Sequence, residues 1–245
     1  MTFRKPLVGC WPKRNALEEK KQRKWLNIAM KMVSRGRAPN GLATIRKRYT
    51  PKWVQFYTKR IGSKPTDTKW RMFEPLLRER FFSLCGYCEE LCKGEIDHFQ
   101  PKSVFPRKVY VWKNWIYACH VCNNFKSETW IQDGYVNPCA ILPGETPERF
   151  FSFDIKTGQV LPKAALSASE AQRAKDTIED LKLNAYHHLQ KRVRWLEVLE
   201  QALKKSDGSA ESKAALVTLV SSPTRELRTI TRAYLCENQI IDVGV

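Results

Sequence analysis

Two pairs of cysteines constrain the fold of this chain more than any other feature of its sequence. Cys85 and Cys88 form the first Cys-x-x-Cys pair, Cys119 and Cys122 form the second, and 30 residues separate the pairs. Each pair can present two sulfur atoms from one tight turn, so four thiolates can hold one zinc ion in a closed tetrahedral site. We expect this zinc to be structural, because no coordination position remains for water and the segment is too short to fold by apolar burial alone.

Disulfide bonds are a less favourable use of these cysteines. The chain has eight cysteines but no apolar segment that would serve as a secretion signal or span a bilayer, so we expect a cytoplasmic protein without membrane contact, whose thiols stay reduced. Metal binding then explains the paired spacing better. Cys92, four residues after Cys88, and His120, inside the second pair, are alternative ligands. The cysteines expected to be free thiols are Cys10, Cys139 and Cys236.

Positive charge is concentrated in the first third of the chain. The formal net charge is +18, and residues 1–80 hold 22 Lys and Arg against 5 Asp and Glu, whereas residues 81–245 hold 21 against 20. Such a block creates a local positive potential that attracts polyanions, and nucleic acid is the first partner to expect. A solvated basic surface that only aids solubility is the alternative. The candidate nucleic-acid-binding residues are Arg46, Lys47, Arg48, Lys52, Lys59, Arg60 and Lys102.

The hydrophobic content of 42% suits a globular chain, and its patterning suggests three parts. Residues 1–80 are expected to form a basic, mostly helical region that includes an amphipathic helix over residues 13–35. The aromatic residues of segment 46–82 are interpreted as core residues more readily than as base-stacking platforms. Residues 81–165 are expected to form a zinc-stabilised domain, and residues 166–245 a helical region.

Local patterns predict the elements of the second and third parts. Alternating and apolar runs predict strands near residues 95–99 and 109–112 and a hairpin over residues 151–161. Ser167 and Glu170 have the spacing of a capping box at the start of a long helix. The expected helices cover residues 167–205, 211–220 and 223–240. The fold class is therefore α+β, a mainly helical chain around a small zinc-clamped centre.

A set of polar residues at characteristic intervals lies between and after the cysteine pairs. Asp97 and His98 form an Asp-His doublet, Asn114 follows, and Asn123 precedes Lys126 by three residues. Together with the four cysteines, this order strongly resembles the HNH endonucleases. The resemblance implies a ββα-metal motif, which is a β-hairpin followed by a helix, and it implies that Asn114 holds the loop and orients the histidine.

The same residues suit the hydrolysis of a phosphodiester bond. That reaction needs a base for the attacking water, a hard cation on the phosphate and charge that stabilises the leaving oxygen. His98 is the candidate base, because a neutral imidazole is available near neutral pH. Asp97 and Asn123 offer oxygen ligands for a catalytic Mg²⁺ or Mn²⁺. Lys126, one helical turn beyond Asn123, is expected to face the phosphate as a point charge.

Two other functions fit parts of this pattern. A zinc-ribbon adaptor that binds nucleic acid without cleaving it would explain the cysteines, but it would leave the Asp-His doublet and the two asparagines as coincidences. A stand-alone homing or restriction endonuclease would use the same chemistry without a partner. HNH sites act on DNA and on RNA, such as structured tRNA, so the motif does not select the target.

A more specific resemblance extends over roughly residues 80 to 195. The segments Cys85–Glu89, Ile96–Ser103 and Trp112–Trp115, with Arg192 downstream, resemble the HNH subunits of bacterial anti-phage systems, the PtuB-type proteins of Septu and of retron-linked Septu-like systems. This resemblance implies a toxic effector nuclease that a PtuA-type ATPase partner controls. A retron reverse transcriptase and its DNA product are further components that it implies.

Overall fold

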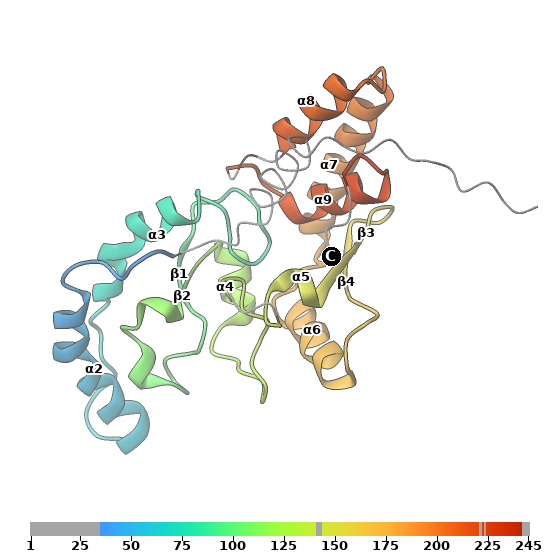
Figure 1. Ribbon diagram of the computed structural model, residues 1–245. Coiled ribbons are helices and arrows are strands. Elements are labelled where there is room, and N and C mark those ends of the chain that lie inside the picture. Colours follow the sequence, from blue (N-terminus) through green and yellow to red (C-terminus); the bar gives the residue numbers. More distant parts are fainter. Residues whose placement is uncertain (1–34, 141–143, 221, 223, 242–245) are drawn as a thin grey trace, which may run out of the picture.

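The computed structural model describes residues 35–140, 144–220, 222 and 224–241 (Figure 1). The helix expected over residues 13–35 lies outside the described residues except for Arg35, and so does Cys10. Within these ranges, helices surround two small antiparallel hairpins, which confirms the α+β fold class. None of the helices in the described part of the chain combines the length and the low polarity needed to cross a lipid bilayer.

The elements follow one another in three groups along the chain. The basic region contributes α2 (Leu42–Lys59), the 3₁₀ helix η1 (Lys69–Phe73) and α3 (Glu74–Arg80). The cysteine-bearing segment contributes β1 (Glu95–His98), η2 (Pro106–Lys108), η3 (Trp112–Asn114), β2 (Trp115–Ala118) and α4 (His120–Lys126). The remainder contributes α5 (Pro147–Phe150), β3 (Phe151–Asp154), β4 (Gln159–Pro162), α6 (Ala168–Asp180), α7 (Tyr186–Lys204), α8 (Ala210–Val220) and α9 (Arg228–Glu237).

The main hydrophobic core joins the basic region to the first hairpin. Trp53 of α2, Trp70 of η1 and Leu77 of α3 are buried in the same cluster as Trp115 and Tyr117 of β2. The burial of Trp53 and Trp70 supports the core interpretation of these aromatics. A chain segment with a large excess of positive charge is thereby held against the hairpin by apolar contacts, while its exposed cations face solvent.

The first hairpin confirms one expected strand and corrects the other. In β1 and β2, Asp97 pairs with Ile116 and His98 pairs with Trp115. The second strand was expected over residues 109–112, but it lies at Trp115–Ala118, and Tyr110 and Trp112 belong to a loop with two 3₁₀ turns. Both aromatic rings are buried, so their spacing reflects core packing of the loop rather than strand pairing.

The C-terminal part confirms the hairpin and the helix start but divides the expected long helix. The capping box of Ser167 and Glu170 is present at the start of α6. The helix ends at Asp180, and α7 begins at Tyr186 after a break in which Lys182 has a φ of 53°. The break allows Leu181 and Leu183 both to be buried in the main core, which a continuous helix over this segment did not anticipate.

The last helices form a second cluster at one end of the molecule. The helices α7, α8 and α9 lie together there, and α2 lies at the opposite end (Figure 1). Leu199 of α7, Leu216 of α8 and Ile230 of α9 are buried in one hydrophobic cluster, which Phe153 of β3 joins to the rest of the chain. The segment with the four cysteines therefore lies between the basic region and the C-terminal helices.

Candidate functional site

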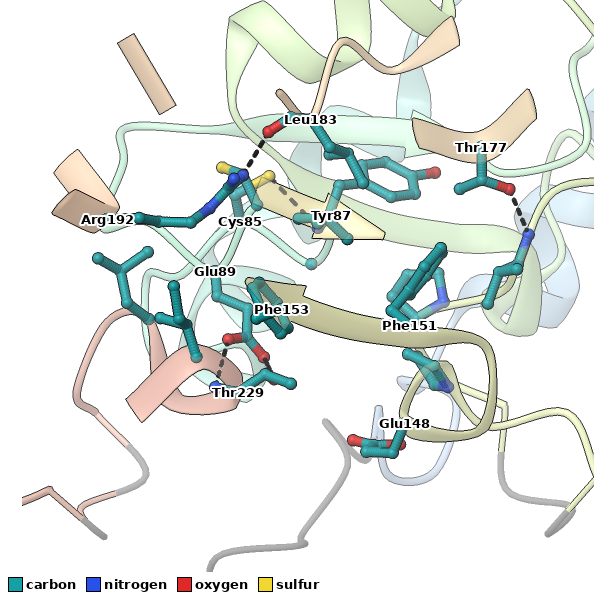
Figure 2. A pocket seen from close by; sticks show the side chains of 18 residues that line it. Cys85, Tyr87, Glu89, Glu148, Phe151, Phe153, Thr177, Leu183, Arg192 and Thr229 are labelled. Atoms are coloured by element: carbon teal, nitrogen blue, oxygen red, sulfur yellow. Dashed lines mark hydrogen bonds between the residues drawn. The ribbon is translucent and has the colours of Figure 1, made fainter. Parts of the chain in front are cut away.

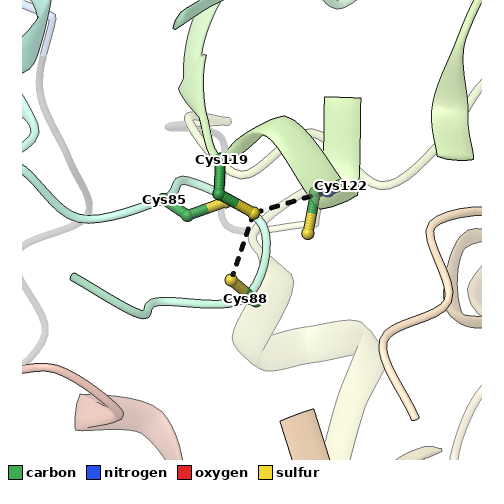
Figure 3. Close-up of side chains that lie close together, drawn as sticks. All are labelled: Cys85, Cys88, Cys119 and Cys122. Atoms are coloured by element: carbon green, nitrogen blue, oxygen red, sulfur yellow. Dashed lines mark hydrogen bonds between the residues drawn. The ribbon is translucent and has the colours of Figure 1, made fainter. Parts of the chain in front are cut away.

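The four paired cysteines meet in one place. Their sulfur atoms all lie within 4.8 Å of one another, and the Sγ atoms of Cys88 and Cys119 are 3.9 Å apart (Figure 3). The backbone N–H of Tyr87 points to the sulfur of Cys85 at 3.4 Å, and that of Cys122 points to the sulfur of Cys119 at 3.4 Å. Such turns favour thiolates, so the donor set fits a tetrahedral zinc ion.

The alternative ligands lie outside this group of sulfurs. Burial raises the pKa of the half-buried Cys92 thiol to about 12, and Cys92 is not one of the clustered residues. The exposed ring of His120 lies 3.5 Å from a Glu95 oxygen and contacts Asn124 instead. Cys139 and Cys236 are free thiols. The geometry thus favours Cys85, Cys88, Cys119 and Cys122 as the ligand set over either replacement.

Asp97 is buried and held on both sides. Its side chain is 4% exposed, Oδ1 lies 3.0 Å from Nζ of Lys126, and Oδ2 accepts a hydrogen bond of 2.5 Å from the hydroxyl of Tyr87. Tyr87 lies between the two cysteines of the first pair, so a residue of the zinc turn directly contacts the candidate metal ligand. Each carboxylate oxygen has lone pairs beyond these contacts, so Asp97 can still coordinate a cation.

Lys126 does not face the cleft, and its expected role as a phosphate-facing charge requires correction. The side chain has 0% exposure, and its Nζ donates to Asp97 and to the carbonyl of His98, each at 3.0 Å. The spacing along α4 predicted one helix face for Asn123 and Lys126, but the longer side chain turns inward beneath β1. Its positive charge neutralises the buried carboxylate instead.

His98 is the second buried polar residue of β1. Its Nε2 lies 2.8 Å from the carbonyl oxygen of Val109, so Nε2 carries the proton and Nδ1 has the lone pair. The ring of Trp70 packs edge-on against it, with the ring centroids 4.9 Å apart. Burial, reinforced by the positive charge of Lys102, holds the pKa of His98 well below its ordinary value. The imidazole is therefore neutral near pH 7, as a proton acceptor must be.

Asn114 connects the two ends of the loop between the strands. Its Oδ1 accepts from the N–H of Gln100 at 2.8 Å, and its Nδ2 donates to the carbonyls of Gln100 at 3.0 Å and Lys108 at 3.2 Å. Val109, whose carbonyl binds His98, directly follows Lys108. The amide of Asn114 is thus one residue removed from the contact that fixes the imidazole.

A small cleft of about 200 Å³ brings the candidate base His98 together with the two candidate metal ligands, but Asn114 and Lys126 do not line it. Asp97, His98, Lys102 and Asn123 all line it. Asp97 and His98 are the last two residues of β1, and both line the cleft although neighbouring side chains of a strand alternate between its faces. The ammonium group of Lys102 lies 5.6 Å from the centre of the Trp70 ring, and burial lowers its pKa.

Asn123 is oriented by a carboxylate that the sequence analysis did not select. Its Nδ2 donates to Glu95 at 2.7 Å, which leaves its carbonyl oxygen for a cation. This oxygen and the carboxylate of Asp97 border the same cleft, and oxygen donors are the kind of ligand that Mg²⁺ and Mn²⁺ prefer. Glu95 could have been found from the sequence. It lies two residues before Asp97 in the predicted strand, and residues two apart share one face of a strand. Tyr87 and Trp70 carried no comparable signal.

Six of the seven candidate nucleic-acid-binding residues are exposed, whereas Lys102 is partly buried, and three members of the set line a groove. The groove, of about 1340 Å³, runs between α2 and the loop over residues 107–113. Among the described residues, six cations and no carboxylate line it, and the cations are Arg37, Arg46, Lys47, Lys59, Arg107 and Lys113. Arg48 and Lys52 lie instead against the ring of Tyr49, and Arg60 follows the end of α2. Of these seven predicted residues, Lys102 alone lines the cleft that contains Asp97 and His98.

Comparison with known proteins addresses the middle of the chain. No curated protein gave a match to the sequence. The residues that form the four-sulfur cluster, the first hairpin, the loop and α4 fall together in one matched segment. Residues 85–129 match the family model for HNH endonuclease, so this segment is similar to the endonucleases of that family.

Proposed function

We propose that the protein is an endonuclease that hydrolyses phosphodiester bonds of nucleic acid with the help of Mg²⁺ or Mn²⁺. The observation that carries this proposal is the cleft lined by Asp97, His98, Asn123 and Lys102. A neutral imidazole, two oxygen donors and a positive charge border the same small space. A zinc-ribbon adaptor would have no use for this combination.

The chain's own groups have distinct tasks in this reaction. Nδ1 of His98 accepts a proton from water, while the contact between Nε2 and Val109 keeps the ring in one orientation. Asp97 and Asn123 would hold the divalent cation, which neutralises charge on the phosphate and on the leaving oxygen when it is bound. Lys102 adds positive charge at the cleft wall. The four cysteines and their zinc hold the turn that carries Tyr87 against Asp97.

Nuclease assays on a pair of histidine variants test this function. Plasmid DNA and structured RNA are incubated with Mg²⁺, with Mn²⁺, or with a chelator that leaves the zinc bound. We expect cleavage with a divalent cation and about 100- to 10,000-fold slower cleavage by His98→Ala. His187→Ala, which changes an exposed histidine of α7, is the control and should cut like the wild type. Equal cleavage by His98→Ala would refute the base, and binding without any cleavage would favour the adaptor.

We further propose that this nuclease is the effector of a bacterial anti-phage system and that a PtuA-type ATPase restrains it in the cytoplasm. The support is the resemblance carried by Cys85–Glu89, Ile96–Ser103 and Trp112–Trp115, two of which include residues of the cleft or its loop. A retron reverse transcriptase and its DNA are candidate further components. Co-purification of the tagged chain with the products of neighbouring genes tests the complex. Phage infection of cells that express wild type or His98→Ala tests whether protection requires cleavage.

A further inference from the structure

The four-sulfur centre has a buried neighbour from a distant part of the chain. His188, in the first turn of α7, is 1% exposed, and its Nε2 lies 3.8 Å from Sγ of Cys122. The two residues are 66 positions apart in the sequence. Neither the cysteine spacing nor the HNH segment accounts for a histidine at this position, because His188 lies outside residues 85–129.

Glu90 fixes the orientation of this imidazole. One of its carboxylate oxygens contacts Nδ1 of His188, and the other lies 2.8 Å from Nζ of Lys191, one turn further along α7. Glu90 is 5% exposed and follows the first cysteine pair by two residues. Ligand atoms of Cys88, Glu90 and His188 all lie within 4.8 Å of one another. Metal-ligating histidines are commonly held by a carboxylate in this way, and groups that contact the ligands from outside tune a metal centre.

The residues around Glu90 also bind the last helix and the turn before it. The carboxylate of Glu89 accepts hydrogen bonds from the backbone N–H of Thr229 at 2.8 Å and from its hydroxyl at 2.6 Å (Figure 2). Thr229 lies in the first turn of α9, where backbone N–H groups favour a negative charge. The N–H of Leu91 donates to Glu226 at 2.8 Å. Three consecutive residues after the first cysteine pair thus hold the C-terminal region.

We propose that Glu90 and His188 form the outer shell of the zinc centre, so that zinc binding and the docking of α7 and α9 stabilise each other. This inference rests on the four-cysteine zinc site but not on nuclease activity. His188 fixes one side of Cys122, and Glu90 connects the turn that holds Cys88 to α7. Binding free energies are reciprocal, so a change that loosens the helices must also weaken zinc retention.

Zinc release from the full-length chain tests the outer shell. The rate is followed with a colorimetric chelator after the wild type is shown to contain one zinc per chain. Loss of an outer-shell partner typically weakens metal binding about 10- to 100-fold, so we expect His188→Ala to retain zinc correspondingly less well. Tyr186→Ala removes a ring that is 77% exposed from the same helix turn and should release zinc at the wild-type rate. Equal release by the two variants would overturn the proposal.

Cobalt substitution separates a direct contact from a general loss of stability. We expect His188→Gln to remain folded and to shift the sulfur-to-cobalt charge-transfer band. The band depends on the energy of the sulfur lone pairs, and the variant replaces the imidazole that contacts Sγ of Cys122. Glu90→Gln should shift the band in the same direction by a smaller amount. A merely structural role for His188 would leave the band where the wild type has it, and that result would contradict the proposal even if zinc loss were faster.

The coupling between zinc binding and helix docking is also tested with a variant of α9, at the contact between Thr229 and Glu89. Thr229→Val removes the hydroxyl that binds Glu89 without touching a cysteine or His188. We expect faster hydrogen exchange in α9 together with several-fold faster zinc release. Thr218→Val is the control, because the Thr218 hydroxyl donates to the Ala214 carbonyl within α8. If α9 exchanges faster in Thr229→Val while zinc release stays unchanged, the helices and the metal are not coupled. Wild-type chain without zinc would instead refute the metal site itself.

Discussion

Asp97 depends on two side chains that come from different elements. The hydroxyl of Tyr87 holds one carboxylate oxygen, and Lys126 holds the other. Both contacts are made to the Asp97 carboxylate, which is 4% exposed. Hydrogen bonds to a buried charged group contribute more to the free energy of unfolding than hydrogen bonds at the surface do. The pair of contacts fixes the direction in which the remaining lone pairs of Asp97 point. Changing Tyr87 therefore tests what fixes the orientation of the Asp97 carboxylate, and changing Lys126 tests what balances its charge.

Tyr87→Phe tests the orienting contact. We expect the variant to keep its zinc, to lose about 1–3 kcal/mol of stability in urea unfolding, and to bind Mn²⁺ more weakly, because Asp97 loses the donor that fixes it. Mn²⁺ binding is measured by electron paramagnetic resonance. Tyr135→Phe is the matched control, since its hydroxyl donates to Asp180 at 2.6 Å away from the cleft. Equal Mn²⁺ affinity in the two variants would show that Tyr87 does not orient the ligand.

Lys126→Met tests whether the buried charge serves stability. Removing one partner of a buried ion pair typically costs about 3–5 kcal/mol, because the other charge remains without compensation. We expect a loss of this size in urea unfolding and a smaller loss when Asp97→Asn is added, since the double variant leaves no unpaired charge. The four proteins form a double-mutant cycle. A stable Lys126→Met protein that had lost only cleavage would restore the expectation that this lysine faces the phosphate.

The loop between β1 and β2 links the fold of the HNH segment to the orientation of His98. Asn114→Ala removes three hydrogen bonds that connect residues 100 and 108. We expect faster hydrogen exchange over residues 100–113 and slower cleavage, because Val109 no longer holds the imidazole in place. Asn184→Ala is the control, since Asn184 makes a comparable pair of hydrogen bonds to Val160 of β4. Cleavage that fell equally in both variants would point to global destabilisation instead.

Local signals predicted the elements that local interactions determine. The capping box of α6 and the hairpin formed by β3 and β4 depend on residues close in sequence, and both are present. The second strand was misplaced because Tyr110 and Trp112 are buried by contacts with distant residues, which sequence spacing does not reveal. The break at Lys182 has the same origin, since it serves the burial of Leu181 and Leu183 in a core built from distant segments.

In the candidate site, too, local sequence patterns predicted the features that depend on residues close in sequence. The cysteine cluster was predictable because paired spacing has few other uses, and Asp97, His98 and Asn123 do line one cleft. The burial of Lys126 was not predictable, because helix spacing gives the face of a residue near the end of α4 but not the direction of a long flexible side chain. Tyr87 and His188 reach the site only through tertiary folding, so their sequence neighbourhood did not distinguish them.

The positive charge of the groove between α2 and the loop over residues 107–113 suggests where the proposed nucleic-acid substrate binds relative to the cleft. The loop that carries Val109 forms one wall of the basic groove, and its other side faces His98. Arg107 and Lys113 of this loop line the groove together with Arg46 and Lys47 of α2. A nucleic-acid backbone bound in the groove would therefore contact the same loop that orients the base. The groove extends the predicted basic region to two cations that lie outside residues 1–80.

The salt dependence of binding tests this arrangement. For duplex DNA, log K falls with log salt by about 0.9 for each phosphate contact, so Arg107→Gln combined with Lys113→Gln should reduce the slope by about 2. Binding is followed by fluorescence anisotropy in a KCl series without divalent cations, so that cleavage does not interfere. Lys182→Gln combined with Lys213→Gln removes two exposed lysines of the C-terminal part and should leave the slope unchanged. If both double variants lowered the slope equally, the positive charge would act through the net charge of the protein, and the groove would not hold the backbone.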